Sequence, residues 1–348
     1  MITSAPNSKR KQQILTGVVH AYIESGQPVS SRAISQRNPE SLSPASIRNA
    51  MAELEEEGFL YQPHTSAGRV PTAAGYRFFA QAVSAEAKLD PEDQEWIRSE
   101  LAAATTPGEV AERAGHVLAS MSRGLGIIVS PSLAKSVLEH IRFMLLPDGR
   151  VVTVLVSAGG IARDKILRPA RAFTQEDQDR TAEYLNREYA GRTLATIRAD
   201  LLARLAGDQE RYDQLVRNAL ELCDPRLLGE NEAPQVHVEG AAQIAAAPEF
   251  ADQAQLRELL ATIEEREKLV ALLSSCIDAP EAVHVQIGIE GISAGGGQLT
   301  LISAPYAWLD QAQGSIGVLG PMRMHYERAI TAVAYVARLF SESPGGRS

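Results

Sequence analysis

The sequence of 348 residues predicts an α+β protein of several domains, in which an N-terminal winged helix-turn-helix precedes a β-rich domain that a largely helical insertion splits. Three observations lead to this fold class. Helix signals and a short hairpin fill the first 85 residues, the apolar period changes from that of helices to that of strands near residue 124, and strands resume near residue 283 after a charged helical region. The length is typical of two or three domains.

The helix predicted from Ser43 to Gly58 organises the first domain. Ser43 is a favourable N-cap and Gly58 a favourable residue after the last turn, and the apolar side chains between them recur at helical spacing. The opposite face is small, polar and cationic in its first turns, where it carries Ser46, Arg48 and Asn49, and only its end is acidic. A helix that enters a DNA groove by its first turns has this distribution.

Shorter patterns on both sides of this helix complete a helix-turn-helix with a wing. Residues 9–25 predict a first helix, and Ser30 is placed to cap a short second helix over residues 30–37. After the third helix, strands at 59–62 and 69–71 enclose a loop that is too long for a two-residue turn. This order of helices and hairpin matches a winged helix.

The remaining chain predicts a second domain with an insertion. Strands are expected at 124–130, 137–146, 150–159, 163–169, 235–240, 283–290, 298–303 and 314–319. Helices are expected at 96–104, 106–123, 174–225 and 249–276, and in a last helix that Pro321 starts. The predicted boundaries are 1–85 for the DNA-binding domain, 86–106 for a helical connector, 107–173 with 277–348 for the β-rich domain, and 174–276 for the insertion.

The charges favour nucleic-acid binding only in the N-terminal quarter. The chain carries a formal net charge of −9, yet residues 1–85 contain eight Lys and Arg against six Glu, a net charge of +2. A phosphate-binding surface is therefore expected in this part of the chain, although +2 alone does not identify a DNA-binding protein.

Several classes of protein lack support in the sequence. No apolar run of 18 residues predicts a membrane span, the first eight residues lack the apolar core of a signal peptide, and Cys223 and Cys276 form no CxxC pair. We therefore expect a cytoplasmic protein with both cysteines buried as small apolar residues. The seven histidines lack metal-ligand spacing, and neither a phosphate-binding loop nor a GxSxG motif is present. No metal, cofactor or catalytic residue is expected.

Four stretches resemble the family of the heat-inducible transcription repressor HrcA. They are GQPVSSRAIS at 26–35, LSPASIRNAMAELEEEGFLYQPHTSAGRVPTAAGYRFF at 42–79, LPDGRVVTVLV at 146–156 and GSIGVLGPMRMHYERAI at 314–330. The resemblance covers essentially the whole chain and implies a winged helix, a GAF-like α/β domain and an inserted dimerisation domain. It also implies a homodimer that represses heat-shock chaperone operons from an inverted-repeat operator in double-stranded DNA, the CIRCE element, with the chaperonin as a modulator.

The resemblance also implies which residues contact DNA. Ser46, Arg48 and Asn49 are expected in the major groove, where Asn suits adenine and Arg suits guanine or a phosphate. The other expected contacts are Ser30, Ser31 and Arg32 at phosphates, and His64, Thr65 and Arg69 in the wing, with Arg69 in or beside a minor groove. An alternative stays open for each group. In one, Arg48 and Asn49 form only a solvated helix face, and in the other, Arg69 braces the hairpin instead of contacting DNA.

Three functions remain open at this point. The first is a homodimeric operator-binding repressor, in which phosphate contacts supply affinity and base contacts supply the choice of site. The second is a small-molecule-gated winged-helix regulator that senses through its GAF-like domain, and fold analogy alone supports it. The third is an enzyme with an attached DNA-binding domain, which no motif supports. Arg323 and Tyr326, in the fourth stretch, are expected to be structural or to lie at a domain contact.

Overall fold

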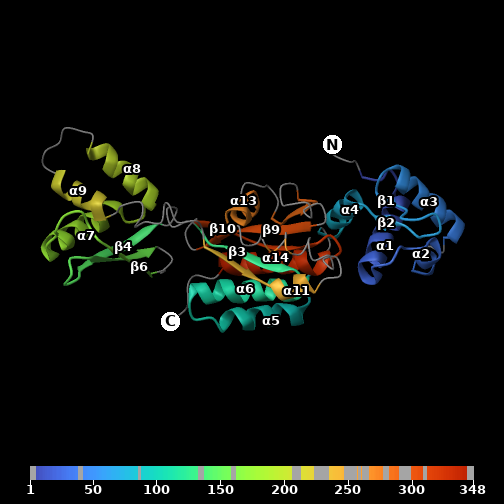
Figure 1. The fold of residues 1–348 in the computed structure, drawn as a ribbon, viewed down its shortest axis with the longest axis horizontal. Helices are drawn as coiled ribbons and strands as arrows, with labels where there is room; N and C mark the ends of the chain where they lie inside the picture. Colours follow the sequence, from blue (N-terminus) through green and yellow to red (C-terminus); the bar gives the residue numbers. More distant parts are fainter. Residues whose placement is uncertain are drawn as a thin grey trace.

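A computed structural model defines the fold. It describes residues 5–37, 42–84, 88–131, 137–157, 162–205, 213–222, 235–246, 266–276, 282–289, 299–308 and 312–342, together with Arg257 and Leu260. Three units follow one another along the long axis, as Figure 1 shows, and the central unit contains segments from both the middle and the end of the chain. The mixture of helices and strands confirms the predicted α+β class.

The N-terminal unit is helical with one short pair of strands. Its elements are α1 (Lys9–Ser25), α2 (Ser31–Arg37), α3 (Pro44–Glu56), β1 (Leu60–Tyr61), β2 (Val70–Pro71) and α4 (Ala73–Ser84). The first three helices agree closely with the predicted ranges. β1 and β2 are antiparallel, and a further bridge joins Val29 to Arg69. The segment before α2 therefore lies alongside the hairpin.

Local signals in the sequence set the ends of these helices. The Ser43 hydroxyl accepts a hydrogen bond from the Ser46 amide at 3.1 Å, as an N-cap does. Gly26 and Gly58 follow α1 and α3 with φ angles of +65° and +80°, a conformation that glycine adopts without strain. The apolar faces of α1, α3 and α4 meet in one core, to which Leu15, Ile47, Leu54 and Phe79 belong.

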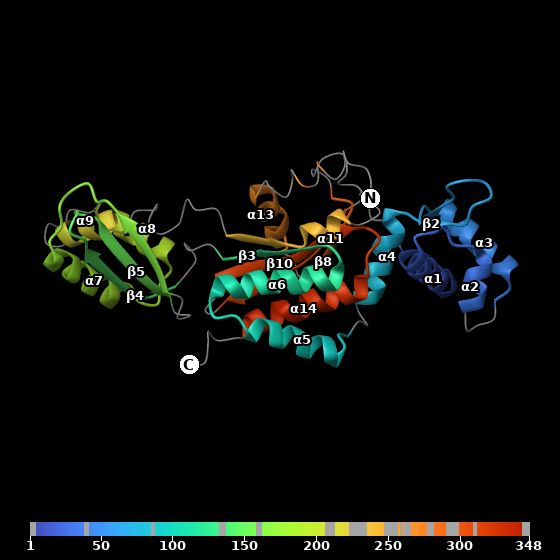
Figure 2. The same ribbon diagram turned by 60° about the horizontal axis from the view of Figure 1, so that its bottom comes forward.

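The central unit is an antiparallel sheet between two layers of helices. Its strand order is β7-β3-β10-β9-β8, formed by β7 (Val236–Glu239), β3 (Leu125–Val129), β10 (Ala312–Pro321), β9 (Leu299–Trp308) and β8 (His284–Ile287). One face is covered by α6 (Pro107–Ser122) and α14 (Tyr326–Glu342), with α5 (Pro91–Ala102) outside them, and the other by α11 (Ala241–Ala245) and α13 (Arg266–Ser274), as Figure 2 shows. Both faces of the sheet are therefore buried, which fits the uninterrupted apolar burial of β3.

The third unit is inserted between β3 and β7, which are neighbours in the central sheet. It contains β4 (Leu138–Leu145), β5 (Val151–Ser157) and β6 (Ala162–Leu167), followed by α7 (Gln175–Tyr189), α8 (Leu194–Leu205) and α9 (Asp213–Leu222). The three strands form a sheet of their own in the order β4-β5-β6, and their apolar side chains share a core with the three helices. The chain thus leaves and re-enters the central unit at adjacent strands.

This arrangement corrects the predicted division of the second domain. The prediction groups residues 107–173 with 277–348 in one domain, whereas β4, β5 and β6 form a separate sheet that shares its core with α7, α8 and α9. Alternation identifies a strand but not the sheet that it joins: β4, β5 and β6 pair with one another in sequence order, whereas β3 pairs with the distant β7 and β10. β7 and α13, which the prediction gives to the insertion at 174–276, belong to the central unit, since β7 pairs with β3 and α13 buries Leu269 and Leu273 there.

Several smaller expectations can be compared with the described residues. Pro321 is expected to start the last helix, but it ends β10 opposite Leu299, and α14 begins only at Tyr326. Cys276 is buried as expected, whereas Cys223 and part of the predicted helix at 249–276 lie outside the described residues. Among the described helices, none is long and apolar enough to span a membrane.

Side-chain amides cover one of the two edges of the inserted sheet. β4 is an edge strand, and Asn186 of α7 donates to the carbonyl oxygen of Ile141 at 3.0 Å and accepts from the Ile141 amide at 2.8 Å. Gln175 donates to the carbonyl oxygen of Phe143 at 3.2 Å and accepts from the Leu145 amide at 3.1 Å. Unpaired strand edges invite pairing with other chains, and these amides occupy that edge from within the chain.

Candidate nucleic-acid interface

The outer face of α3 carries the residues predicted to contact bases. Arg48 and Asn49 are exposed, and the side chain of neither forms a hydrogen bond or ion pair with another residue in the described part of the chain. Ser46 is half-buried, and its hydroxyl accepts from the Ser43 hydroxyl at 3.1 Å. Arg48 and Asn49 are thus available to a ligand, whereas Ser46 is partly held by the helix cap.

The start of α2 brings Ser30, Ser31 and Arg32 together. The Ser30 hydroxyl accepts from the Ala33 amide at 3.2 Å and thereby caps the helix. Ser31 is half-buried, while Ser30 and Arg32 are exposed. The Arg32 guanidinium has no partner among the residues that the structure describes, so its charge is available to an anion.

The loop between β1 and β2 is closed by Gln62. Its side-chain amide donates to the carbonyl oxygens of Thr65 at 3.0 Å and Ala67 at 2.9 Å, and the Ala67 amide donates to the carbonyl oxygen of His64 at 2.8 Å. The side chains of His64 and Thr65 are exposed. The loop therefore has a defined shape that presents these two side chains outward.

Arg69 faces the protein rather than the solvent. Its guanidinium is 2.7 Å from the Glu55 carboxylate, and its side chain is only 17% exposed. Its backbone exchanges two hydrogen bonds with Val29, at 2.8 and 2.9 Å, and Gly68 beside it has no room for a Cβ, which would lie 2.4 Å from the Val29 carbonyl. Of the two alternatives for Arg69, the geometry favours the brace of the hairpin over insertion into a groove.

The acidic end of α3 is held by basic residues from other elements. Glutamates at a helix C-terminus oppose the helix dipole, a cost that the sequence leaves without compensation. In the structure, the Lys11 ammonium lies 2.6 Å from Glu53 and 2.7 Å from Glu57, and these two hydrogen bonds raise the pKa of Lys11. Glu55 binds Arg69. Lys11 and Arg69 are partners of these glutamates that the sequence analysis misses. The run of glutamates is the one local signal that points to basic partners.

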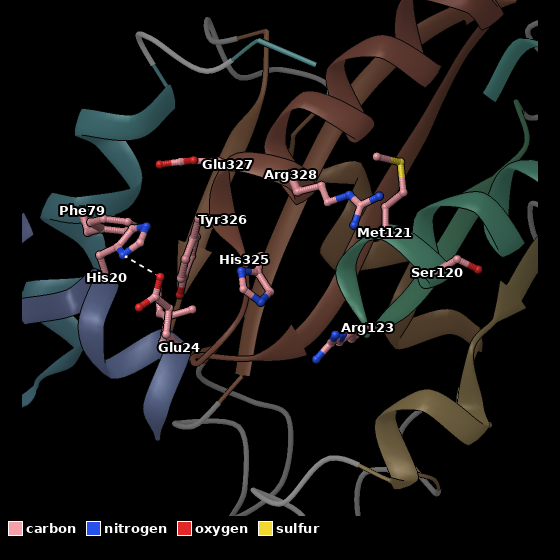
Figure 3. Close-up of a pocket in the computed structure, with 11 residues that line it drawn as sticks. His20, Glu24, Phe79, Ser120, Met121, Arg123, His325, Tyr326, Glu327 and Arg328 are labelled. Carbon is pink, nitrogen blue, oxygen red and sulfur yellow. Dashed lines mark ion pairs between the residues drawn. The ribbon is translucent and has the colours of Figure 1, made fainter. Parts of the chain in front are cut away.

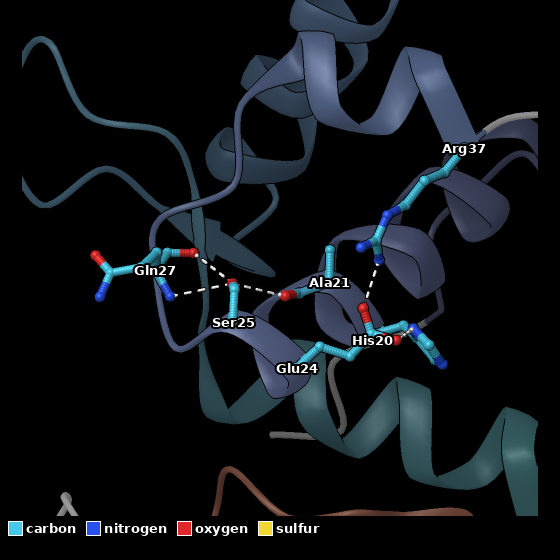
Figure 4. A network of polar contacts seen from close by, with 6 residues as sticks. All are labelled: His20, Ala21, Glu24, Ser25, Gln27 and Arg37. Carbon is cyan, nitrogen blue, oxygen red and sulfur yellow. Dashed lines mark hydrogen bonds and ion pairs between the residues drawn. The ribbon is translucent and has the colours of Figure 1, made fainter.

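A polar network joins the end of α1 to the end of α2, as Figure 4 shows. The Glu24 carboxylate is 2.7 Å from the Arg37 guanidinium and 3.4 Å from Nδ1 of His20. The hydrogen bond from Arg37 holds the pKa of Glu24 below its usual value. Ser25 donates to the carbonyl oxygen of Ala21 at 2.8 Å. The contact between Glu24 and Arg37 ties the end of α2 to the end of α1.

The N-terminal unit meets the central unit at Arg323 and Tyr326. The Tyr326 ring centre lies 6.0 Å from the ring centres of both Tyr76 and Phe79 in α4. Arg323 donates to the carbonyl oxygen of Ile23, in the last turn of α1, at 3.5 Å. The expected domain contact is therefore confirmed for both residues. Within the described ranges, no group of three or more His, Cys, Asp or Glu side chains is placed to hold a metal ion.

Comparisons with known proteins now define the class. A family model for the HrcA protein C terminal domain matches residues 108–330. A curated relative from Geobacter sulfurreducens is 35% identical over 335 residues, which cover 96% of this chain and 97% of that protein. One from Xylella fastidiosa is 34% identical over 330 residues, which cover 95% of this chain and 94% of that protein. Both carry the name heat-inducible transcription repressor HrcA, so the chain falls in the class of transcription repressors. It belongs to the HrcA family.

A solved structure supports the fold alone. It is described as the crystal structure of a hypothetical protein at 2.2 Å resolution, and it matches 96% of this chain and 98% of its own with a TM-score of 0.61 at 22% sequence identity. The likeness extends over all three units of the chain.

Proposed function

We propose that this chain is a sequence-specific repressor of heat-shock chaperone operons that binds an inverted-repeat operator of the CIRCE type as a homodimer. The observation that carries the proposal is the outer face of α3, where Arg48 and Asn49 are exposed and unpartnered beside a braced hairpin. Together with membership of the HrcA family, this face supports a winged-helix DNA-binding domain over residues 1–85. The DNA that it binds lies in the cytoplasm of a bacterium, where we expect the protein to work.

The charges near α3 support an entry into the major groove by its first turns. Arg48 and Asn49 belong to those turns, whereas Glu53 and Glu57 at the other end are bound by Lys11. A helix that lay flat along the groove would bring these carboxylates close to phosphates. Asn49 suits adenine and Arg48 suits guanine or a phosphate, while Ser30, Ser31 and Arg32 at the start of α2 suit the backbone.

The wing has a smaller role in this proposal than the sequence suggests. His64 and Thr65 are its exposed side chains and the contacts that we expect with DNA. Arg69 positions the hairpin through Glu55 and need not touch DNA itself. The predicted connector at 86–106 contains α5, which packs on the central unit through Asp93 and Glu100, and we propose that this central unit is the GAF-like domain.

The homodimer follows from the symmetry of an inverted repeat, because each half-site presents the same edges to one recognition helix. We propose that the inserted unit between β3 and β7 supplies the dimer contact. It carries exposed apolar side chains that a partner subunit can cover, namely Met144, Ile166, Leu202 and Leu205. The side-chain amides of Asn186 and Gln175, from α7, bind to the edge of β4. They argue against dimer formation by strand pairing at that edge.

Relief of repression on heating is proposed to act through stability. A marginally stable repressor loses its active dimer as it unfolds, and the chaperonin restores it. Purified protein should then lose operator binding after incubation at heat-shock temperature and recover it when chaperonin and ATP are added. Full binding after heating, with no gain from chaperonin, would exclude this form of control.

The function as a whole is tested by binding to the inverted repeat upstream of the organism's own chaperonin operon. Fluorescence anisotropy across a salt titration compares the intact repeat with the same DNA in which one half-site is scrambled. We expect tight binding only to the intact repeat and a steep loss of affinity with salt, because several phosphates are contacted. Equal affinity for intact and half-scrambled DNA would contradict the dimeric repressor. The alternative, a small-molecule-gated regulator that senses through its GAF-like domain, predicts instead that a metabolite changes this affinity.

A further inference from the structure

A groove between the N-terminal and central units brings together basic side chains from three helices. His20 comes from α1, Arg123 follows the end of α6, and His325 and Arg328 lie at the start of α14, as Figure 3 shows. The groove has a cavity volume of about 220 Å³, which is below the roughly 300–1,000 Å³ of sites for drug-sized molecules. Its size suits a small ligand, and its position suits a ligand that contacts both units.

The acidic side chains of the groove leave this positive charge largely in place. Glu24 is already bound by Arg37 at 2.7 Å and by His20 at 3.4 Å. Glu327 lines the rim, but in Figure 3 its side chain extends away from Arg123. Glu24 raises the pKa of His325 and so offsets part of the positive charge, although Arg37 occupies one of its carboxylate oxygens.

The imidazole of His325 reports the local potential. Burial is the main cause that lowers its pKa, and Arg123, Arg328 and His20 lower it further, whereas only Glu24 raises it. Burial disfavours a charge of either sign, but the neighbouring charges of Arg123 and Arg328 disfavour a positive charge and favour a negative one in the same place. An anion in the groove is therefore electrostatically favoured.

Arg123 is the basic group that is most available. Arg328 is paired with Asp93 at 2.9 Å, whereas Arg123 has no hydrogen bond or ion pair to the residues that the structure describes. Arg123 also has a φ angle of +57°, the one positive value at a residue other than glycine in the described chain. The left-handed region strains L-residues, and glycine is common where a helix ends in this conformation. An arginine here is explained if its side chain binds a ligand.

We propose that this groove binds a small oxyanion of the size and charge of phosphate or a compact phosphate ester. Arg123 supplies a fixed positive charge, His325 supplies an N–H donor, and the amide end of α14, which begins at Tyr326, adds the positive end of a helix dipole. The bound anion contacts the N-terminal unit through His20 and the central unit through the other groups. The bound anion thereby favours one orientation of the N-terminal unit relative to the central unit. A consequence for DNA binding rests on the proposed function, whereas the binding of the anion does not.

Thermal unfolding of the full chain measures the binding of inorganic phosphate. Melting temperatures are compared in potassium phosphate and in potassium chloride of equal ionic strength. The variant Arg123→Gly is expected to fold well, because glycine relieves the backbone strain at this position. The control Arg338→Gln removes an exposed arginine of α14 that does not line the groove and lies 3.6 Å from Glu342 and 4.9 Å from the centre of the Tyr335 ring. We expect phosphate to raise the melting temperature of wild type and control, and the apparent affinity to fall about tenfold or more in Arg123→Gly, as for one lost charge-assisted contact.

His325 gives an independent readout of the same event. Phosphate should raise the pKa of its imidazole in an NMR titration, with His325→Gln used to assign the signal, since a bound anion stabilises the protonated ring. Equal melting-temperature increases in wild type, Arg123→Gly and Arg338→Gln would reveal a general salt effect and overturn the proposal, as would no increase in wild type. Because no DNA is present in these measurements, their outcome is separate from that of the operator-binding test.

Discussion

Glu55 joins the end of α3 to the hairpin of β1 and β2, so its replacement by glutamine tests how this hairpin is held. One of its carboxylate oxygens lies 2.7 Å from the Arg69 guanidinium. The other accepts a hydrogen bond from the backbone amide of Gln62 at 3.1 Å. Glu55→Gln keeps an oxygen for Gln62 and the same shape, but it removes the negative charge that faces Arg69.

The free energy lost in Glu55→Gln is expected to lie between that of losing a surface ion pair and that of breaking a buried one. Exposed pairs contribute about 0.2–1 kcal/mol, and loss of one partner of a buried pair costs about 3–5 kcal/mol. The Arg69 side chain is 17% exposed and the Glu55 side chain is 34% exposed, so solvent screens one side of the pair only. We expect a loss of about 1–2 kcal/mol, which is a factor of about 5–30 in the equilibrium for opening the hairpin.

Native-state hydrogen exchange measures this opening at the amides that hold the hairpin. The amides of Val29 and Arg69 pair with each other's carbonyl groups, and both should exchange about 5–30 times faster in Glu55→Gln. Glu56→Gln changes an exposed carboxylate on the next residue and should leave both rates unchanged. Equal acceleration in the two variants, or none in Glu55→Gln, would refute the proposed role of Glu55.

Three further changes have distinct expected outcomes. Arg32→Ala should weaken binding to all DNA sequences alike and reduce the slope of log affinity against log salt by about one, as the loss of one phosphate contact does; an altered base preference in a binding assay would contradict this. Asn186→Leu removes both side-chain partners of the Ile141 backbone, so faster hydrogen exchange at that amide and some self-association in light scattering are expected, and unchanged exchange would count against a protective role. The pKa of His325 should lie below 6.5 in an NMR titration. Because the folded-state pKa of His325 is lowered, the contribution of this residue to stability is complete above its unfolded-state pKa. That contribution is lost as the pH falls from the unfolded-state pKa towards the folded-state pKa. The melting temperature of wild type should therefore fall further on mild acidification than that of His325→Gln.

The first unit shows how far local signals reach. Ser43 and Gly58 mark the ends of α3 correctly because an N-cap and a left-handed glycine act within a few residues of their own position. The same holds for α1 up to Gly26. The exposure of Arg48 and Asn49 follows equally from the helical period, which places Asn49 opposite the buried Ile47 and Arg48 at the flank of that outer face.

Contacts between distant segments could not be predicted in this way. The alternation of β4, β5 and β6 identifies them as strands but does not specify their sheet, which depends on pairing and on a core shared with α7, α8 and α9. The direction of Arg69 depends on Glu55, which belongs to a different element. The glutamates at the end of α3 are likewise stabilised by Lys11, which lies far away in sequence.

The proposed recognition of bases by α3 is tested most directly by a base-pair scan with Asn49→Ala. The affinity of wild type and variant is measured for the inverted repeat of the chaperonin operon and for copies in which each base pair of a half-site is changed in turn. We expect wild type to lose about 1–3 kcal/mol at one A·T position and Asn49→Ala to lose its preference at that position alone. If Asn49→Ala binds the unaltered repeat as tightly as wild type and keeps every base preference, α3 does not read the operator through its first turns.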